Sequence, residues 1–295
     1  INADMDTKLI GLENVKDMIE VMVNELEEWK EKGEPEEDIK LNNFILVGNP
    51  GTGKDTVADY LAKVYFSFGL LGTSDKVERS ASDFASPNMG GAQEKMREAL
   101  EEARAKKAML FINEAHELCN ERFDGKGAIK TLIAPLTDKK NPVMVVFAVY
   151  KDEVQNFLQL DVGLNRRTKI IELEDYTPDE LMQIARIAAE KDNLMLPPET
   201  EQILKAVLEK VYETRTIGTG NAGYIIDKLI PAINVRRRAR CKKMKIGYTS
   251  QKGRIVCPED IPPELRGNID IRNAEQRIKE LENLKKEIAG IVGYD

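Results

Sequence analysis

The first 175 residues alternate between short apolar runs and amphipathic segments. The apolar runs are nearly continuous, which is typical of strands buried on both faces of a sheet. They lie at residues 43–47, 108–112, 143–148 and 168–173. Helical periodicity occupies the stretches between and before them, at about residues 13–32, 54–66, 93–104 and 126–136. Helices that alternate with such strands predict a parallel sheet covered on both faces.

From residue 176 onward the pattern is almost entirely helical. Thr177 is suited to cap a helix, with Pro178 at its first position and Glu180 three residues on. Helical periodicity continues to about residue 243, and a loop with one short strand at 254–256 follows. We therefore expect three parts: an α/β domain at 1–175, an all-α domain at 176–266 and a charged linker at 267–295. The linker is expected to contain a charged helix at 274–288.

The two ends of the chain carry similar short segments. Residues 10–13 read Ile-Gly-Leu-Glu, and residues 292–295 read Val-Gly-Tyr-Asp. One hypothesis is that the second copy begins another module of the same kind, so that this chain is one unit of a tandem array. A longer parent sequence without a second glycine-rich loop would contradict it.

Composition narrows the class of protein. With 42% hydrophobic and 32% charged residues, the chain can bury a sizeable core. A net charge of −7 argues against general nucleic-acid binding. The basic run at 236–245 is interpreted as a solvated or subunit-facing helix surface, with a phosphate-binding patch as the alternative. Three cysteines without metal-ligand spacing favour an intracellular protein, cytoplasmic or nuclear, and no apolar run is long enough for a membrane span.

A glycine-rich loop at 48–54 follows the first strand and opens a helix. Its glycines allow the backbone N–H groups to face phosphate oxygens, and the helix N-terminus adds partial positive charge. Lys54 is expected to reach the β- and γ-phosphates of ATP or ADP. The residues predicted to bind the nucleotide here are Asn49, Pro50, Gly51, Thr52, Gly53, Lys54, Asp55 and Thr56.

The position after Lys54 departs from the usual loop. A Ser or Thr hydroxyl normally stands there and binds Mg²⁺, whereas this chain has Asp55. Thr56 is a poor replacement, because it lies about 100° further around the helix. A carboxylate about 4 Å from a phosphate costs roughly 4 kcal/mol at an effective dielectric of 20, although a bound Mg²⁺ reverses the sign.

Together with the segment Leu-Phe-Ile-Asn-Glu-Ala-His at 110–116, the loop resembles the AAA+ subfamily of red-type Rubisco activases and stage V sporulation protein K. Further similar segments follow in the family's order. They lie at residues 125–132, 148–153, 163–167, 176–181 and 220–222. The resemblance implies a P-loop α/β domain with a parallel five-stranded sheet and a small all-α lid. It also implies ATP between the subunits of a six-membered ring, a protein client, and Ile10 and Gly11 near the adenine.

Four positions depart from what the resemblance implies. Asn113 replaces the aspartate that helps to hold Mg²⁺, while Glu114, which polarises the attacking water, is retained. Gly223 stands where the lid carries an arginine, and Asn88 where a pore loop carries an aromatic residue. Asp55 is the fourth.

Two further positions keep a candidate role. Arg167 is the candidate arginine finger, which acts on a neighbouring subunit's nucleotide. Tyr150 falls near the first sensor position, and a packed tyrosine at the end of a strand is the alternative.

Two functions stay open at this point. One is a nucleotide-binding module with impaired or lost hydrolysis, acting as a structural or regulatory unit among other AAA+ modules. The other is an active AAA+ ATPase that remodels a protein client. A separate hypothesis concerns the metal. Compared with the family pattern, Asp55 adds one negative charge where a hydroxyl usually stands, and Asn113 removes one from the strand. Asp55 is therefore predicted to bind Mg²⁺ directly in place of the strand aspartate.

Overall fold

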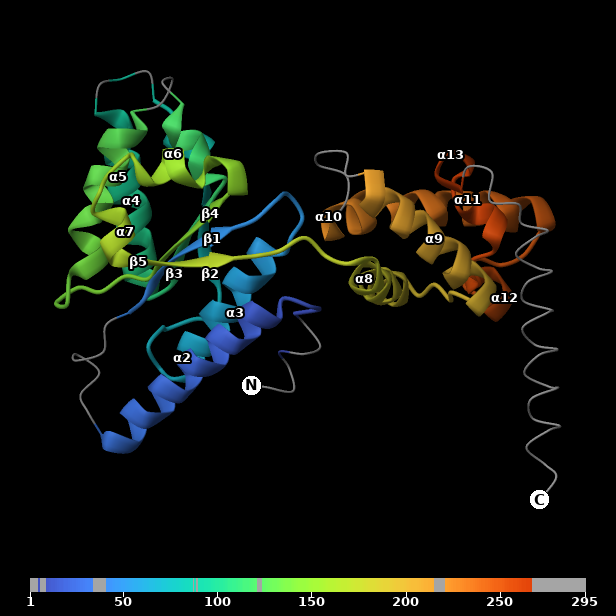
Figure 1. Ribbon diagram of the computed structural model, residues 1–295, viewed down its shortest axis with the longest axis horizontal. Helices are drawn as coiled ribbons and strands as arrows, with labels where there is room; N and C mark the ends of the chain where they lie inside the picture. The colour runs from blue at the N-terminus through green and yellow to red at the C-terminus, as the bar shows by residue number, and fades with distance from the viewer. Residues whose placement is uncertain are drawn as a thin grey trace. The chain divides into compact units, whose positions relative to one another are not determined.

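A computed structural model describes residues 5, 9–33, 41–86, 88, 90–120, 124–214 and 221–266. The chain divides into two compact units, Ile1–Asp175 and Tyr176–Asp295 (Figure 1). The charged helix expected at 274–288 and the repeated segment at 292–295 lie outside the described residues. No helix in the described part of the chain is both long and apolar enough to cross a membrane.

The first unit is built on a parallel sheet of five strands in the order β2-β3-β4-β1-β5. The strands are β1 (Asn43–Val47), β2 (Lys76–Ser80), β3 (Met109–Asn113), β4 (Val145–Val149) and β5 (Thr168–Glu172). Four of them confirm the apolar runs to within two residues. The sequence pattern did not identify β2, because only Val77 of this edge strand is buried and its other side chains are polar.

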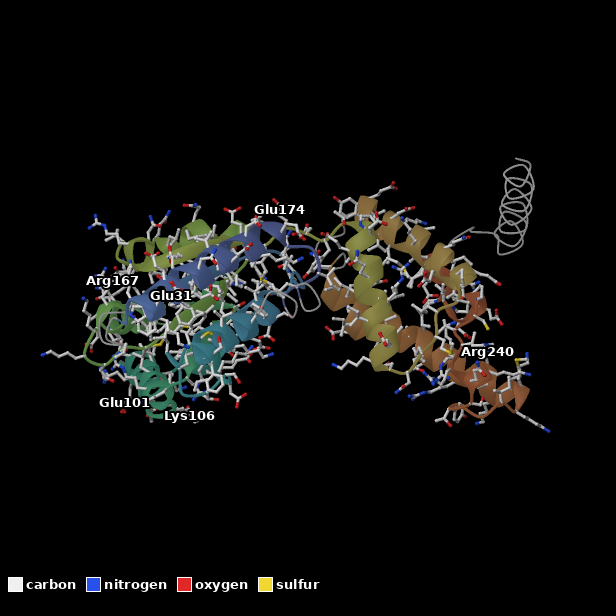
Figure 2. All side chains as sticks on the ribbon, turned by 90° about the horizontal axis from the view of Figure 1, so that it is seen from below. Glu31, Glu101, Lys106, Arg167, Glu174 and Arg240 are labelled. Carbon is white, nitrogen blue, oxygen red and sulfur yellow. The ribbon has the colours of Figure 1, made fainter. Side chains whose placement is uncertain are left out.

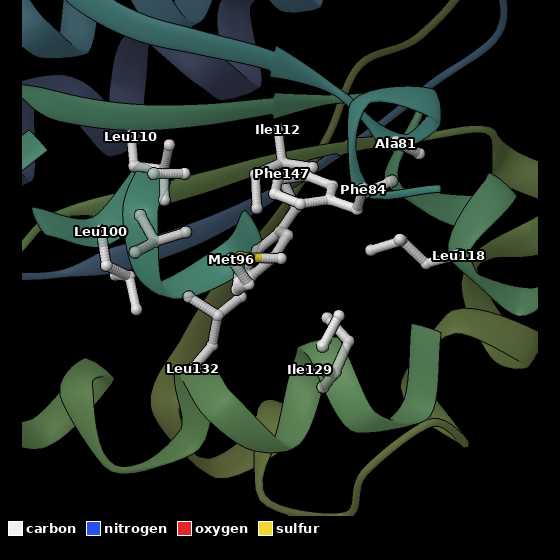
Figure 3. Packing of buried hydrophobic residues seen from close by; sticks show 14 of the residues in the cluster. Ala81, Phe84, Met96, Leu100, Leu110, Ile112, Leu118, Ile129, Leu132 and Phe147 are labelled. Carbon is white, nitrogen blue, oxygen red and sulfur yellow. The ribbon is translucent and has the colours of Figure 1, made fainter. Parts of the chain in front are cut away.

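Helices cover both faces of the sheet (Figure 1). On one face, α4 (Gly91–Lys106) and α5 (Gly125–Ile133) pack their apolar sides against the strands. Met96 and Leu132 meet Phe147 and Ile112 there, and all four are fully buried (Figure 3). The other face carries α2 (Glu13–Lys32) and α3 (Lys54–Ser67). This two-sided burial explains why the central strands are apolar on both faces.

The helices begin and end where the local sequence requires it. In α2 the buried side chains recur at helical spacing, and Gly33 ends the helix in the left-handed region, where its amide donates to the Lys30 carbonyl. Shorter helical turns connect the strands. They are η2 (Ala81–Phe84), η3 (Ala115–Cys119), η4 (Pro135–Thr137), η5 (Lys151–Glu153), α6 (Val154–Leu158) and α7 (Leu164–Arg167).

The second unit is helical, as expected. Thr177 caps its first helix through the predicted capping box with Glu180. The elements are α8 (Pro178–Lys191), α9 (Pro198–Thr214), α10 (Ala222–Tyr224), the π-helix η6 (Ile225–Leu229), α11 (Ile230–Met244), α12 (Gln251–Arg254), η7 (Pro258–Asp260) and α13 (Pro263–Arg266).

The strand expected at 254–256 is wrong. Ser250 accepts a hydrogen bond from the Gly253 amide and so caps the short helix α12, which includes Arg254. Ile255 then forms a single parallel bridge to Met195, which belongs to no strand. A short apolar run becomes a strand only where a neighbouring strand can pair with it, and here the pairing stops after one bridge.

Two arginines of the basic run at 236–245 face inward. Arg237 is 4% exposed and bonds to Asn234 and to the carbonyls of Tyr248 and Gly253. Arg240, labelled in Figure 2, binds the Asp260 carboxylate at 2.9–3.1 Å and the Ile255 carbonyl at 2.7 Å. These two arginines stabilise the second unit, so neither is available to a phosphate.

Candidate nucleotide site

Three segments meet at the carboxyl edge of the sheet. Strands β1, β4 and β3 are neighbours and run in the same direction, so their carboxyl ends lie side by side. The glycine-rich loop follows β1, Tyr150 follows β4, and Asn113 with Glu114 ends β3. Ligands of open parallel sheets bind at this edge.

The glycine-rich loop keeps the backbone shape of a phosphate cradle. Gly51 and Gly53 have φ angles of 76° and 89°, which side chains with a Cβ adopt only under strain. The Thr52 hydroxyl, fully buried, donates to the Asn49 carbonyl at 2.8 Å. The Asn49 amide donates to both oxygens of Asp175, at 3.0 and 3.1 Å. Asp175 therefore ties the loop to the segment that follows β5.

Lys54 is the first residue of α3 and is 9% exposed. Its ammonium donates to the carbonyls of Gly48 at 2.7 Å and Asn49 at 2.9 Å, so it curls over the loop. Burial lowers the pKa of Lys54 to about 8, although the charges of Glu114 and Asp175 partly offset this. The ammonium therefore lies against its own loop, where a nucleotide phosphate would be a stronger hydrogen-bond acceptor than the two carbonyls.

Asn113 and Glu114 form a tight turn at the end of β3. The Glu114 amide donates to the Asn113 side-chain oxygen at 3.0 Å. Glu114 has a φ of 50°, a left-handed conformation that is uncommon for a residue with a side chain. Such strain is typical of functional positions, where the surrounding structure fixes it.

Tyr150 connects Glu114 to the loop. Its hydroxyl donates to Glu114 Oε1 at 2.9 Å, and the Lys54 ammonium lies 5.0 Å from the centre of its ring. Burial, together with the hydrogen bond and charge of Glu114, raises the pKa of Tyr150 to about 12. The phenol therefore stays protonated and remains a donor. His116 packs on the same ring, with centroids 4.2 Å apart, and burial lowers its pKa.

Asp55 lies on the exposed side of the first turn of α3 and pairs with a lysine from the sheet. Its carboxylate accepts a hydrogen bond from the Lys76 ammonium, which also lies 2.9 Å from Asp59 and 3.6 Å from Glu78. Burial disfavours the Lys76 ammonium, but its hydrogen bonds to Asp55 and Asp59 outweigh this and raise the pKa of Lys76. Thr56, the next residue, is exposed.

The residues at these positions do not fit a Mg²⁺ ion in this arrangement. Hard divalent cations need several oxygen ligands, usually including carboxylates. Asn113 offers only a neutral amide, whose oxygen accepts from the Glu114 N–H, and the Asp55 carboxylate is paired with Lys76. The hypothesis that Asp55 binds Mg²⁺ stays a prediction and requires Asp55 to leave Lys76.

Comparison with known families matches both units. Residues 44–174 match the profile described as the ATPase family associated with various cellular activities (AAA), and residues 177–270 match the AAA lid domain. Protein CbbX of Cereibacter sphaeroides is 32% identical over 211 residues, which cover 70% of this chain and 68% of that protein. The chain belongs to the AAA ATPase family.

Other relatives point to the same subfamily that the motifs resemble. Stage V sporulation protein K of Bacillus subtilis is 31% identical over 215 residues, covering 70% of this chain and 65% of that protein. A chloroplastic ribulose bisphosphate carboxylase/oxygenase activase from Cyanidioschyzon merolae is 28% identical over 219 residues, covering 71% of this chain and 73% of that protein. This chain therefore spans about two thirds to three quarters of the length of these three relatives.

A solved structure shares the fold. The Thermotoga maritima RuvB Holliday junction branch migration motor superposes with a TM-score of 0.54 at 21% identity, over 85% of this chain and 67% of that one. At this identity the likeness concerns the fold alone. It agrees with an AAA domain that is followed by a helical lid.

The remaining positions with an AAA role are placed as follows. Ile10 and Gly11 are half-buried just before α2, whose Asn14 donates to the Glu172 carbonyl at the end of β5, 2.8 Å away. Since β5 lies beside β1, this bond brings the segment to the loop's edge of the sheet. Arg167 ends α7, where its Nη1 donates to the Gly163 carbonyl at 3.2 Å. Their roles toward adenine and a neighbouring nucleotide stay predictions.

The structure shows few contacts at the pore-loop position, Asn88, and at the lid position, Gly223. Asn88 is exposed, and its neighbours Pro87 and Met89 lie outside the described residues. In the lid, the Asn221 side chain accepts a hydrogen bond from the Tyr176 amide at 3.2 Å, which fixes the start of the second unit. Gly223, half-buried in α10, brings no charge to the place where the resemblance implies an arginine.

Sequence reasoning missed two residues of the site, Asp175 and Lys76. Asp175 follows β5 directly, and carboxyl ends of parallel strands gather at one edge, so its position after a strand was a usable signal. Lys76 had no such signal. It belongs to the one strand that the pattern did not identify, and its side chain approaches the loop from the edge of the sheet.

Proposed function

We propose that this chain is an ATP- or ADP-binding AAA module with impaired hydrolysis, and that it acts as a structural or regulatory unit in a ring or tandem assembly of AAA modules. One observation carries the proposal. The phosphate cradle is intact around a buried Lys54, while the residues that would hold the catalytic metal are a neutral amide and a carboxylate already paired with Lys76. Nucleotide binding and hydrolysis thus depend on separate groups. The groups for binding are all present, whereas the groups that would hold the catalytic metal are not.

The absence of a metal carboxylate at β3 weakens hydrolysis more than binding. Phosphoryl transfer depends on positioning and on neutralising charge that develops on the phosphate oxygens, which a metal ion usually supplies. Nucleotide binding depends chiefly on the loop N–H groups, the helix N-terminus and Lys54. A module of this kind can hold nucleotide as a structural element, and in a ring it can offer Arg167 to the site of a neighbour.

An active, protein-remodelling ATPase is the second candidate. Glu114 is retained at the end of β3 and lies within hydrogen-bonding distance of Tyr150, so the group that would polarise water is present. The relatives include a ribulose bisphosphate carboxylase/oxygenase activase, a name that implies action on another protein. A protein client is therefore part of this second proposal, and neither candidate calls for a specific nucleic acid or a membrane.

An intracellular location, cytoplasmic or nuclear, belongs to both proposals. All three cysteines of the chain lie in its described part and are free thiols. Unpaired cysteines are typical of proteins that stay in reducing compartments.

The deciding experiment measures binding and turnover on the same protein. Nucleotide affinity is measured by calorimetry, and phosphate release is followed at saturating Mg·ATP, alone and with candidate partner modules. The proposal expects binding that Lys54→Ala removes, with little turnover by the isolated chain. Robust hydrolysis that Glu114→Gln abolishes would establish the second candidate instead.

A further inference from the structure

Lys76 is a lysine of the sheet whose ammonium lies at the first turn of the phosphate-loop helix. It contacts Asp55 and lies 2.9 Å from Asp59 on the next turn of α3. The Lys76 side chain is 10% exposed, which is unusual for a residue type that normally remains in solvent. Its Nζ also lies 4.4 Å from the centre of the Phe111 ring, so a cation–π contact adds to the ion pairs.

The location of this ammonium relates it to the nucleotide. Phe111 lies two residues before Asn113 on β3, and alternate residues of a strand share one face. Lys76 therefore extends along the same face of β3 that carries Asn113. Asp55 is the residue directly after Lys54, where a phosphate loop ordinarily has its metal-binding hydroxyl. The Asp55–Lys76 pair thus occupies the part of the loop that usually serves the metal.

The pair also explains how an acidic residue is tolerated beside phosphates. An isolated carboxylate at position 55 would repel the phosphates of the nucleotide. Lys76 supplies the missing positive charge from within the chain. Asp59 and Glu78 also pair with Lys76, and all three carboxylates are about half exposed or more, so solvent screens the charge of each of them.

We propose that Lys76 is a resident cation of the phosphate loop, so that this chain binds ATP and ADP without a divalent metal. This inference rests on the nucleotide-binding function proposed above and deepens it. The phosphates are met by Lys54, by the loop N–H groups and by the N-terminus of α3, and Lys76, which Asp55 shares with Asp59 and Glu78, reduces the repulsion from Asp55. The metal becomes dispensable because both of its usual ligand positions are already satisfied.

The test compares nucleotide affinity in millimolar Mg²⁺ with affinity in excess EDTA, by calorimetry with ATP and with ADP. Wild type is expected to bind equally in the two buffers, within about twofold. Lys76→Met is expected to weaken binding in EDTA by about tenfold, which corresponds to about 1.4 kcal/mol, because Asp55 is then uncompensated. Lys63→Met is the control: Lys63 is an exposed lysine of α3, the helix whose Asp55 and Asp59 pair with Lys76, and its loss is expected to leave affinity unchanged.

A double-mutant cycle separates the pair from a general charge effect. Asp55→Thr restores the usual hydroxyl, and Asp55→Thr with Lys76→Met removes both charges together. If Lys76 acts through Asp55, the double variant recovers most of the affinity that Lys76→Met loses in EDTA. Additive losses would overturn the proposal, as would an equal loss in Lys63→Met. Thermal unfolding of each variant confirms that the proteins compared are folded.

The wild-type measurement needs no variant and distinguishes the two levels of inference. Binding in Mg²⁺ that weakens by more than about tenfold in EDTA would overturn the resident-cation proposal and favour Asp55 as a metal ligand. Absence of binding in both buffers would instead reject the proposed nucleotide-binding function. Equal binding in both, lost in Lys54→Ala, supports both proposals.

Discussion

Lys54 is buried before any nucleotide arrives, and this burial determines its protonation. Its ammonium is satisfied by two loop carbonyls, by the face of the Tyr150 ring and by the charges of Glu114 and Asp175. A phosphate would give it a full anionic partner in the same enclosed position, where charge-assisted hydrogen bonds are strongest. The residue therefore links nucleotide binding to proton uptake.

Nucleotide affinity is expected to fall as pH rises from 7 to 9. The pKa of Lys54 is lowered to about 8, so the cation is largely present below that pH and is lost as the pH rises through it. One unit above the pKa only about a tenth of the lysine is charged, which predicts up to roughly tenfold weaker binding at pH 9. Calorimetry across this range is the measurement. Lys54→Arg keeps its charge and is expected to bind with a flat profile, and an equally flat profile in wild type would contradict the prediction.

Tyr150→Phe is expected to raise the residual turnover of the chain. The Tyr150 hydroxyl donates to the Glu114 carboxylate at 2.9 Å and so competes with a water molecule for that group. A hydrogen bond to a charged group contributes about 1.5 kcal/mol, which allows an increase of up to roughly tenfold. Steady-state phosphate release is measured with Glu114→Gln as the background. A turnover that falls below wild type would instead assign Tyr150 the sensor role that its position in the motif suggested.

At the scale of elements, the order of the strands brings the residues of the site together. One of these residues, Lys76, lies on an edge strand that the sequence pattern does not reveal. The central strands are apolar on both faces and are readily recognised, whereas β2 has solvent on one side and a mixed pattern. In the lid, buried polar contacts from α11 hold short helical turns. One of these turns, α12, includes Arg254, so the strand predicted at 254–256 does not form. Local pattern therefore predicts the central elements better than the peripheral ones.

Asp260→Ala is expected to destabilise the lid by about 3 kcal/mol. Asp260 is 1% exposed and binds Arg240, whose side chain is 13% exposed, so removing the carboxylate leaves a largely buried guanidinium without its charge partner. Chemical denaturation followed by circular dichroism measures the loss. Arg238→Ala, an exposed arginine of the same helix, is the control and is expected to change stability by less than about 0.5 kcal/mol. Equal effects of the two substitutions would contradict a role for the buried pair.

At the scale of the whole molecule, the chain is an AAA domain followed by an AAA lid domain, and the proposed role in an assembly requires residues that act on a neighbour. Arg167 illustrates this. Its Nη1 bonds to the Gly163 carbonyl, and its Nε is buried without a hydrogen-bond partner among the described residues. Arg166, the preceding residue, is exposed. Whether Arg167 or Arg166 acts on the nucleotide of a neighbouring subunit is therefore a prediction to be tested with both residues.

Arg167→Ala is expected to lower the turnover of an active AAA module assembled with this chain. An arginine supplied from a neighbour contributes about a thousandfold or more to phosphoryl transfer in enzymes that use one. The measurement is phosphate release by the mixed assembly, with Arg167→Ala and Arg166→Ala compared at equal assembly by light scattering. A loss confined to Arg166→Ala would assign the arginine-finger role to Arg166. Unchanged turnover in both variants would exclude this segment from the partner's site.

The sequence alone determined much of this protein. The loop at 48–54, strands β1, β3, β4 and β5, the cap at Thr177 and the AAA resemblance are all local signals, because periodicity and turn chemistry are properties of consecutive residues. The pairings Asn49–Asp175, Tyr150–Glu114 and Lys76–Asp55 join side chains 126, 36 and 21 residues apart. Strand order and register decide which of these side chains meet, and no local pattern specifies them. The sequence thus identified Asp55 as the unusual residue, and only the tertiary structure gave it Lys76 as its partner.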